Sequence, residues 1–253
     1  MRVVGIVQGR MNSSRLPGKI LKKIAGKPML AQVVERARQA RLIDAVAFAT
    51  TTDPSDDPVE VYCRRQGIPV YRGSLLDVLD RFYQAARMME ADVVVRFTAD
   101  CPLLDPGLVD QTIQLFLESG ADFAANRLPP PFRRTYPIGL DTEVCSFAAL
   151  ERAWKEATAK HDREHVLPYL YEVEGRFKVR ILDHHQDYGY HRWTVDTPED
   201  LVLVRRIFRR MRNRPGFTWL DVVALLEHEP QLARINAAVQ HKTMFDVDER
   251  YKG

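Results

Sequence analysis

The sequence has little cysteine and little net charge. Its 253 residues contain three cysteines, Cys63, Cys101 and Cys145, with no CxxC spacing. This indicates neither a disulfide framework nor a zinc-cysteine site and favours a reducing, cytoplasmic location. The 37 basic and 34 acidic side chains leave a net charge of +3. That excess is too small to favour nucleic acid as a partner, although it suits a protein whose small substrates are anionic.

Long apolar runs, internal repeats and low-complexity tracts are also absent from the sequence. No stretch of about 18 consecutive apolar residues is present to span a membrane, and the short apolar run at the N-terminus does not resemble a secretory signal. We therefore expect no membrane insertion. The length suits one large or two small domains, and because no linker is evident, residues 1–253 are expected to form a single domain.

The sequence does contain a regular alternation of short β-branched runs with amphipathic segments. Buried-looking runs between helical patterns are typical of a mostly parallel sheet with helices on both faces. We therefore expect a three-layer α/β/α sandwich. Strands are expected at residues 3–7, 45–50, 68–71, 93–97, 122–125, 177–182 and 193–195. Helices are expected at residues 28–40, from 55 onward, and at 75–89, 106–117, 146–157, 162–172 and 197–211.

The alternation breaks after residue 125. Residues 126–137 hold four prolines and three arginines without an apolar period, and residues 138–144 are expected to return as a strand. Such an excursion predicts a small protruding arm or flap at residues 126–144, which we expect to pair with a second subunit in a homodimer. Residues 215–253 are expected to form a less regular C-terminal tail.

The most informative segment is the polar loop that directly follows the first expected strand. A loop in this place lies at the carboxyl edge of the sheet, where α/β proteins bind ligands. Its cations, serines and glycine-opened amides predict a cradle for several phosphates, although a merely basic, solvated loop would have the same composition. The spacing fits neither a Walker A loop nor a GxGxxG motif. The residues expected to contact the nucleotide phosphates are Gln8, Gly9, Arg10, Ser13, Ser14, Arg15 and Lys19.

Two aspartates at strand ends are candidates for a metal site. Asp100 and Asp196 each directly follow an expected strand. Mg²⁺ is commonly held by one or two carboxylates together with substrate phosphates, so two carboxylates that meet across the sheet edge predict a magnesium site. The alternative role for Asp100 is to cap its loop. The acidic residues with structural roles, as a helix N-cap or in the first turn of a helix, are Asp105, Glu199 and Asp200.

Three further features have rival interpretations. The segment His161 to His165 matches the HxxEH pattern of inverted zinc peptidases, whereas Glu164 and His165 fit equally an acceptor pocket or a helix packed on the sheet. Residues 205–214 contain six arginines beside an apolar helical stripe, which favours a solvated basic face over a membrane or nucleic-acid site. The aromatic and histidine-rich segment 184–193 either lines a pocket or packs as an ordinary strand.

Several motifs occur in one order along the chain: Arg10-Met11-x-Ser13-Ser14-Arg15-Leu16-Pro17-Gly18-Lys19, Ala25-Gly26-Lys27-Pro28-Met29, Thr98-Ala99-Asp100-Cys101-Pro102, Glu164-His165-Val166 and Arg192-Trp193-Thr194-Val195-Asp196-Thr197-Pro198-Glu199-Asp200-Leu201. Together they resemble the cytidylyltransferases. The most similar branch is the spore-coat-polysaccharide type, which is similar to the synthetases that activate sugar acids such as acylneuraminate and Kdo with CMP. The resemblance covers about residues 1–210.

The resemblance implies a nucleotide-diphospho-sugar transferase fold of the GT-A type. It also implies Mg²⁺-dependent transfer of CMP from CTP to an acidic sugar or other anionic acceptor, with release of pyrophosphate, in the biosynthesis of surface polysaccharide. The residues that it implies are Arg10, Arg15 and Lys19 on the triphosphate, Asp100 and Asp196 on Mg²⁺, Arg72, Gly73 and Ser74 near the base, and Glu164, His165 and Arg192 near the acceptor. Among them, Lys19, Arg15 and Asp100 are expected to be catalytic.

The sequence departs from the family pattern at two positions in the first loop. Gly9 stands where alanine is usual, and Asn12 stands where glycine is usual; asparagine tolerates the left-handed region better than most residues, so the loop shape is expected to survive. Two other functional classes stay open at this point. A glycosyltransferase of the same fold would be expected to carry a DxD motif, which Asp100-Cys101-Pro102 is not, and a non-catalytic protein would bind CTP without turnover.

Overall fold

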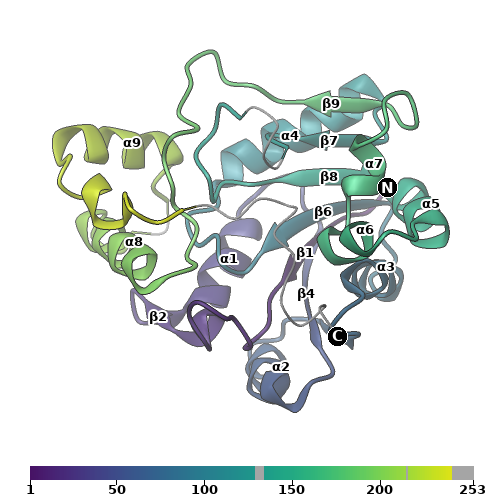
Figure 1. The fold of residues 1–253 in the computed structure, drawn as a ribbon, viewed down its shortest axis with the longest axis horizontal. Coiled ribbons are helices and arrows are strands. Elements are labelled where there is room, and N and C mark those ends of the chain that lie inside the picture. The colour runs from purple at the N-terminus through teal and green to yellow at the C-terminus, as the bar shows by residue number, and fades with distance from the viewer. Residues whose placement is uncertain (129–133, 215, 241–253) are drawn as a thin grey trace.

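The computed structural model describes residues 1–128, 134–214 and 216–240, and within them seven strands form one sheet (Figure 1). Their order across the sheet is β5-β4-β1-β6-β8-β7-β9. The neighbours β5, β4, β1 and β6 run parallel, β8 is antiparallel to both β6 and β7, and β9 is parallel to β7. The strands are β1 (Val3–Gln8), β4 (Ala45–Thr51), β5 (Val70–Gly73), β6 (Val93–Thr98), β7 (Phe123–Ala125), β8 (Glu143–Ser146) and β9 (Val179–Ile181).

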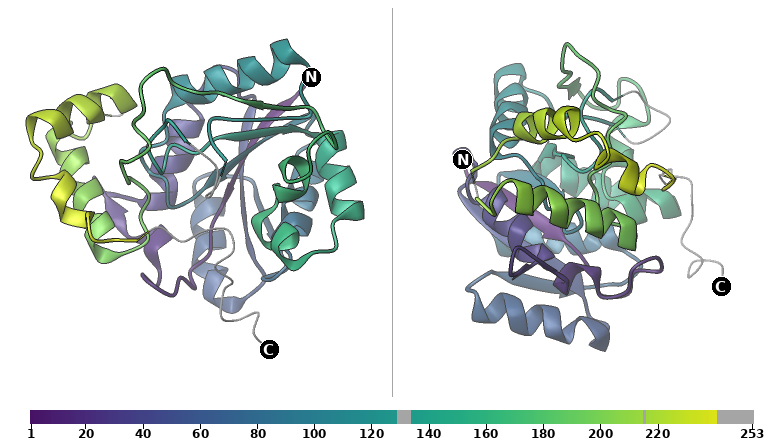
Figure 2. Two further views of the ribbon diagram at one scale, coloured as in Figure 1. Left: turned by 45° about the horizontal axis from the view of Figure 1, so that its top comes forward. Right: turned by 90° about the vertical axis from the view of Figure 1, so that its left-hand side faces the viewer.

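Helices cover both faces of the sheet (Figures 1 and 2). Side chains alternate across a strand: in β1, Val3 and Val7 enter one core while Val4 and Ile6 enter the other. The first core is closed by α1 (Met29–Ala37), α2 (Asp57–Arg65) and α4 (Pro106–Ser119). The second is closed by α3 (Val78–Met88), α5 (Phe147–Glu156), α6 (Lys160–His165) and α7 (Pro168–Tyr171). The predicted three-layer, mostly parallel architecture is confirmed.

Helix boundaries follow local capping chemistry that the sequence contains. Asp105 accepts a hydrogen bond from the Leu108 amide at 2.9 Å, and Ser146 accepts one from the Ala149 amide at 3.1 Å. Thr197 forms a reciprocal capping box with Asp200, and Pro198 occupies the first position of α8 (Pro198–Arg210). Each of these side chains satisfies an amide that the first helical turn leaves without a partner, so the predicted starts of α4, α5 and α8 are correct.

The expected irregular tail at residues 215–253 is wrong where the structure describes it. Residues Trp219–His228 form α9, and Ala233–Asn236 form the 3₁₀ helix η3. A second capping box, between Thr218 and Asp221, starts α9, and Val222, Val223 and Leu226 pack with α8 in a third core at one end of the molecule (Figures 1 and 2). Residues 241–253 lie outside the described part of the chain.

The helix expected at residues 162–172 is divided into α6 and α7. Val166, between them, has φ 76° and ψ −56°, and the Leu167 amide donates to the His165 carbonyl at 3.0 Å, which is the pattern of a γ-turn. The physical reason is Pro168, because a residue before proline disfavours the helical region and proline has no amide to continue the helix.

The expected arm at residues 126–144 is, in its described part, packed into the fold. Asn126, Tyr136 and Leu140 are buried, and Tyr136 contacts Trp219 of α9 edge to face. These residues therefore offer no free surface for a second subunit, and residues 129–133 lie outside the described part. The strands expected at 138–144 and 193–195 are reduced to β8 and to an isolated parallel bridge between Ile138 and Arg192, because this segment bends around the third core.

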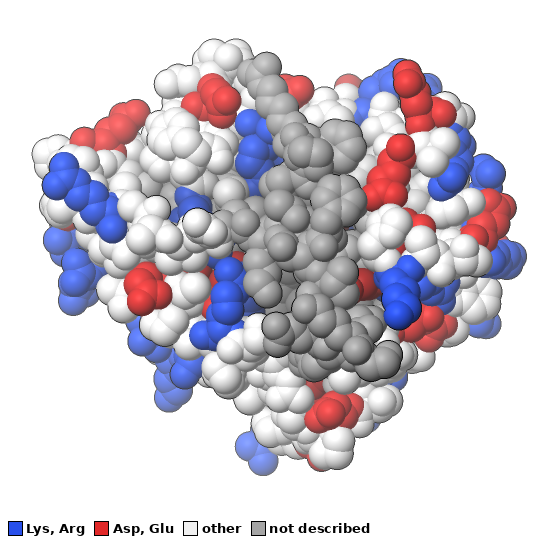
Figure 3. Space-filling view, in the orientation of Figure 1, with Lys and Arg blue, Asp and Glu red and all other residues white. Residues whose placement is uncertain are grey.

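The predicted basic face of α8 is exposed. Arg205, Arg206, Arg209 and Arg210 point outward, and basic groups gather along this edge of the molecule while both signs are mixed elsewhere on the visible face (Figure 3). Arg210 pairs with Glu229 at 2.7 Å. Among the described residues, no helix is long and apolar enough to cross a membrane.

The topology brings two loops to one edge of the sheet. The chain leaves β1 for β4 on one side, and later returns to β6 on the other side of β1. The carboxyl ends of β1 and β6 are therefore the switch point of the sheet, where α/β proteins bind ligands. Between β1 and α1 lie the short elements η1 (Lys19–Leu21), β2 (Lys23–Ile24) and β3 (Lys27–Pro28), and before α2 lies η2 (Pro54–Asp56).

Candidate active site

A cavity of about 250 Å³ opens at this switch point. It is lined by the loop after β1, by the end of β6 and by Asp196. The predicted residues that the structure brings together around it are Gln8, Gly9, Arg10, Ser13, Ser14, Arg15, Lys19, Asp100 and Asp196. All of the residues predicted for phosphate and metal binding thus surround one cavity, although Asp196 is 177 residues from Lys19 along the chain.

The loop has a defined shape that depends on a residue the sequence interpretation missed. The Met11 amide donates to Asp56 Oδ1 at 2.7 Å, and the Met11 carbonyl accepts from the amides of Ser13 and Gly18. Asp56 is almost completely buried and also accepts from the Thr51 amide. Gly18 has φ 67° as it enters η1, a conformation that favours glycine. The run Asp53-Pro-Ser-Asp56, with two aspartates at the start of a helix, is the sequence feature that could have drawn attention to Asp56.

The structure explains why glycine stands at position 9. A Cβ atom added there would lie 2.7 Å from Ala99 Cβ and 3.0 Å from Phe48 Cζ. Real Cβ atoms essentially never come so close to another carbon. Glycine stands here in place of the usual alanine because Phe48 of β4 and Ala99 of the turn after β6 leave no room for a side chain.

We expect Gly9→Ala to lower the free energy of unfolding by about 1 to 3 kcal/mol, because the added methyl group overpacks the strand end. Chemical denaturation measures the loss. Ala99→Gly removes the opposing atom, so the double variant should be more stable than Gly9→Ala. Gly216→Ala is the matched control, since nothing lies within 4 Å of its Cβ position. Equal stability of Gly9→Ala and the wild type would contradict this account.

The ammonium group of Lys19 lies between the two predicted metal ligands. Its Nζ is 2.7 Å from Asp100 Oδ2 and 2.8 Å from Asp196 Oδ1, and it donates to the Val195 carbonyl at 3.0 Å. Lys19 is 8% exposed. Burial lowers the pKa of Lys19, but the charges and hydrogen bonds of both carboxylates outweigh burial and raise it above its usual value. The side chain is therefore a fixed cation at the base of the cavity.

Asp196 is surrounded by cations. Besides Lys19, its other oxygen pairs with Arg15 at 3.0 Å and with Arg192 at 2.7 Å. Burial raises the pKa of Asp196, but Lys19, Arg15 and Arg192 together hold it well below its usual range. Asp196 is thus a permanent carboxylate.

Asp200 has a larger role than the predicted interaction with the helix dipole. It is completely buried and accepts hydrogen bonds from Arg192 Nε at 3.1 Å, from the Asp196 amide at 2.9 Å and from Asn236 Nδ2 at 2.8 Å. It therefore fixes both the backbone and the guanidinium partner of Asp196. Sequence pattern alone does not distinguish this position from an ordinary capping-box residue.

The donor set of Asp100 and Asp196 fits a magnesium ion. Oxygens of both carboxylates contact the same nitrogen atom, Lys19 Nζ, so they converge on one point that already carries a cation. Mg²⁺ is commonly held by one or two carboxylates together with substrate phosphates, and these two carboxylates face the loop predicted to bind phosphate. The Asp100 side chain is 24% exposed, which leaves room for water and phosphate ligands.

A second cavity, of about 170 Å³, adjoins the first. The two share Gln8, Gly9 and Arg10 on their walls. The remaining residues that line the second cavity are Val78, Arg81, Arg96, Glu164 and His165. Glu164 and His165 thus lie beside the first cavity, and their role at an acceptor stays a prediction. The sequence interpretation missed Arg81 and Arg96. Arg96 is a charged residue within the largely apolar strand β6. That departure from the apolar pattern could have indicated a functional role for Arg96.

Arg72 and Arg192 are held in ion pairs and do not line either cavity. Arg72 pairs with Asp57 and Glu60 at 2.7 Å each, and donates to the carbonyls of Thr51 and Asp53. The turn that contains Gly73 and Ser74 is joined to the second cavity by Arg81, whose Nη1 donates to the Ser74 carbonyl at 2.7 Å. The roles predicted for Arg72, Gly73 and Ser74 at the base, and for Arg192 at the acceptor, stay predictions.

The HxxEH segment does not form a zinc-peptidase site in the described part of the chain. His165 lines the second cavity, whereas His161 Nε2 is 2.8 Å from Glu172 Oε2. In the same part of the chain, no cluster of metal-binding donors contains both histidines. Both histidines lie on α6, but His161 pairs with Glu172 while His165 lines the second cavity.

The family profile described as cytidylyltransferase matches residues 4–244. The chain belongs to the cytidylyltransferase family. It is 34% identical over 251 residues to an uncharacterized protein of Methanocaldococcus jannaschii, across 98% of this chain and 100% of that protein. It is 30% identical over 238 residues to the spore coat polysaccharide biosynthesis protein SpsF of Bacillus subtilis, across 91% and 96% of the two chains.

A solved cytidylyltransferase structure has the same fold. The cytidylyltransferase from Leptospira borgpetersenii aligns with a TM-score of 0.86 at 30% identity, across 96% of this chain and 99% of that one. The predicted family, the nucleotidyltransferase-like fold and the assignment as a nucleotidyltransferase are therefore confirmed. The cavity at the switch point of this cytidylyltransferase is accordingly the candidate site for its nucleotide.

Proposed function

We propose that this cytidylyltransferase transfers CMP from CTP to a sugar acid or another small anionic acceptor and releases pyrophosphate, in the biosynthesis of a surface polysaccharide. The observation that carries the proposal is the pair of adjoining cavities that share Gln8, Gly9 and Arg10. One is lined by the cationic loop, which suits the phosphates of a nucleoside triphosphate, and by two carboxylates, which suit the Mg²⁺ that accompanies it. The other supplies arginines beside it, as an anionic acceptor requires.

The chemistry follows from where negative charge develops. An acceptor hydroxyl oxygen attacks the α-phosphorus and loses its proton to water, the bond from the α-phosphorus to the bridging oxygen breaks, and pyrophosphate leaves with the electron pair. Arg10, Arg15 and Lys19 line the cavity where the triphosphate would lie, so they are placed to stabilise the leaving pyrophosphate. In this proposal, Lys19 exchanges its carboxylate partners for phosphate oxygens when CTP binds.

Asp100 and Asp196 would hold Mg²⁺ in the same proposal. When bound, the ion would supply electrophilic polarisation of the α-phosphoryl group. The protein's own contribution is to keep both carboxylates ionised and aimed at one point. Arg15, Arg192 and Asp200 do so through their contacts with the Asp196 side chain and backbone.

The anionic acceptor is supported by three arginines with largely buried side chains, one of which lines the second cavity. Arg96 lines it and pairs with buried Glu143. On the segment after β7, Arg127 and Arg134 share Asp141 Oδ1 at 3.0 Å each. Within the described residues, Arg134 Nε and Nη1 have no hydrogen-bond partner although they are buried. Donors of this kind attract carboxylate or phosphate groups.

The sugar-acid class is supported by the relatives. They include a 3-deoxy-manno-octulosonate cytidylyltransferase of Anaeromyxobacter dehalogenans, whose name specifies a sugar acid, and SpsF, whose name specifies a spore coat polysaccharide. The acceptor proposed for this chain is therefore an acidic sugar rather than an alcohol without charge.

The test is pyrophosphate release from each of the four nucleoside triphosphates with a panel of sugar acids, sugar phosphates and phosphonates, in the presence of Mg²⁺. We expect turnover with CTP and at least about a tenfold lower rate with ATP, GTP and UTP, a discrimination of about 1.4 kcal/mol. Preference for another nucleotide would contradict the cytidylyl assignment. Release of free nucleotide from a nucleotide sugar would instead indicate a glycosyltransferase.

A further inference from the structure

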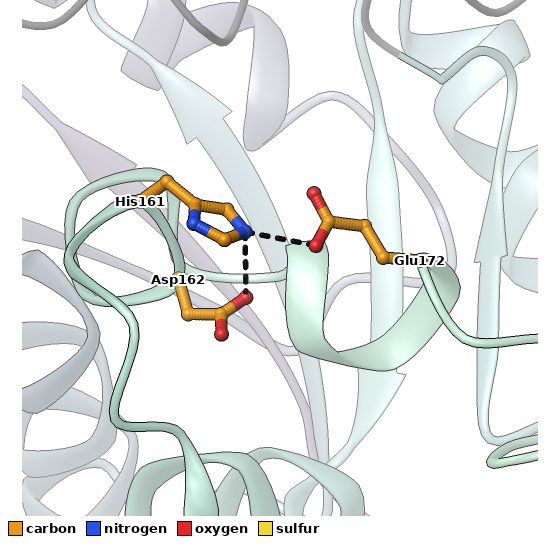
Figure 4. A group of neighbouring side chains, drawn as sticks. All are labelled: His161, Asp162 and Glu172. Carbon is orange, nitrogen blue, oxygen red and sulfur yellow. Dashed lines mark hydrogen bonds and ion pairs between the residues drawn. The ribbon is translucent and has the colours of Figure 1, made fainter.

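A histidine and two carboxylates meet away from the nucleotide cavity, on α6 and directly after α7. His161 Nε2, Asp162 Oδ1 and Glu172 Oε2 all lie within 4.8 Å of one another (Figure 4). Histidine nitrogen with carboxylate oxygen is a donor set that suits divalent transition metals. From this cluster and its surroundings, we infer a second metal site, specific for a zinc-like ion and separate from Asp100 and Asp196.

The observation that points to a cation is the state of Asp162. The residue is 6% exposed, and its Oδ1 has no hydrogen-bond partner within the described part of the chain. This oxygen lies 3.7 Å from His161 Nε2 (Figure 4), which is too far for a hydrogen bond. A buried carboxylate oxygen without a partner costs the full desolvation penalty of a charged group. Burial accordingly raises the pKa of Asp162. A metal ion would remove this penalty by direct coordination.

The spacing of the donors fits coordination with small adjustments. His161 Nε2 is 2.8 Å from Glu172 Oε2 and 3.7 Å from Asp162 Oδ1. Zinc bonds of about 2.0 to 2.2 Å in a tetrahedron place ligand atoms roughly 3.4 Å apart, and this value lies between the two distances. All three atoms lie within 4.8 Å of one another, so side-chain rotations that move them by about an ångström would bring all three donors onto one ion.

The local charge also favours a divalent cation. The two carboxylates make the cluster negative, and the hydrogen bond with Glu172 accordingly raises the pKa of His161. The two arginines that act on Asp162 are occupied elsewhere. Arg163 is paired with Asp77 and donates to the Trp154 carbonyl. Arg176 donates to the Tyr169 carbonyl and lies over the Tyr169 ring.

The site would hold together the corner that presents Glu164 and His165 to the second cavity. His161 and Asp162 precede those residues on α6, Glu172 follows α7, and the strained turn at Val166 lies between them. The His161 side chain is 37% exposed and that of Glu172 is 25% exposed. A fourth position is therefore open to water, as in sites with three protein ligands.

The experiment is a titration of chelator-treated, full-length protein with Zn²⁺ by calorimetry, with excess Mg²⁺ present to occupy Asp100 and Asp196. We expect one equivalent of Zn²⁺ that His161→Ala, Asp162→Asn and Glu172→Gln each weaken at least about 10- to 100-fold. Co²⁺ should give a d–d absorption band that the same substitutions abolish. Neither the calorimetric titration nor the Co²⁺ spectrum depends on enzyme turnover. Both therefore test the metal site even if the protein does not transfer CMP.

Two controls test whether the bound Zn²⁺ lies at this cluster. His185→Gln removes an exposed histidine beside His184 and should leave the Zn²⁺ equivalent unchanged. Asp162→Asn removes a buried charge, so without metal this variant should be at least as stable as the wild type, while Zn²⁺ should raise its melting temperature less than that of the wild type. Unaltered Zn²⁺ affinity in Asp162→Asn, no stoichiometric binding, or loss of binding only in His185→Gln would overturn the inference.

Discussion

Replacing Lys19 with methionine is expected to lower the free energy of unfolding by about 3 kcal/mol, because it leaves Asp100 and Asp196 facing each other without the ammonium group that they share. Methionine retains most of the apolar stem, so the loss reports the charge. Lys19 Nζ is the shared partner of Asp100 and Asp196 at 2.7 and 2.8 Å, and Lys19 is 8% exposed. Urea denaturation in the absence of Mg²⁺ measures the change.

The double variant Lys19→Met with Asp100→Asn separates charge from packing, because Asp196 keeps its pairs with Arg15 and Arg192. With one carboxylate neutral, the repulsion is gone, and most of the lost stability should return, although activity should not. Mg²⁺ should also stabilise Lys19→Met more than the wild type, because the two carboxylates no longer have an ammonium partner. If the double variant were as unstable as Lys19→Met, the stability would depend on packing of the lysine stem, and the electrostatic account would be wrong.

Asp196→Asn in the wild-type background is expected to reduce the rate of pyrophosphate release by about 10² to 10³, the usual cost of one preorganised electrostatic contact. The amide cannot supply the negative charge that pairs with Lys19, Arg15 and Arg192 and that we propose for Mg²⁺. Steady-state assays with CTP at several Mg²⁺ concentrations measure the loss, and Asp100→Asn should behave in the same way.

Glu199→Gln is the matched control for this prediction. Glu199 is an exposed carboxylate three residues from Asp196 in the same segment, so its neutralisation should leave the rate within about twofold. The melting temperature of each variant is compared with that of the wild type to detect unfolding. Full activity in Asp196→Asn, with a normal melting temperature, would refute the metal role proposed for this residue.

Elements defined by local chemistry could be predicted from the sequence. The strands β1, β4 and β6 follow β-branched runs, and the starts of α4, α5 and α8 follow Asp105, Ser146 and Thr197. Each depends on periodicity or on a hydrogen bond within a few residues. The prediction of one helix at 162–172 was wrong because Pro168 has no amide with which to continue the helical hydrogen bonds.

The predictions of a protruding arm at 126–144 and an irregular tail at 215–253 were wrong for a different reason. Both were defined by a lack of regular pattern, yet Tyr136, Leu140 and Val222 belong to one core. An irregular segment can be as buried as a helix when a distant segment packs against it. The sequence of the irregular segment alone does not show which distant segment that is. For α9 the sequence does contain a local signal, the capping box that begins at Thr218.

The sequence by itself determined the family of this protein, and it identified the loop proposed to bind phosphate and the two aspartates proposed for the metal, because these are motifs of fixed spacing. Only the tertiary structure decided that Lys19 bridges Asp100 and Asp196, that Arg81 and Arg96 line a second cavity, and that Asp162 is buried beside His161 and Glu172. The physical reason is distance along the chain. Local patterns carry information over a few residues, whereas the charges in these sites are balanced by groups that the sheet topology brings together from segments as far as 177 residues apart.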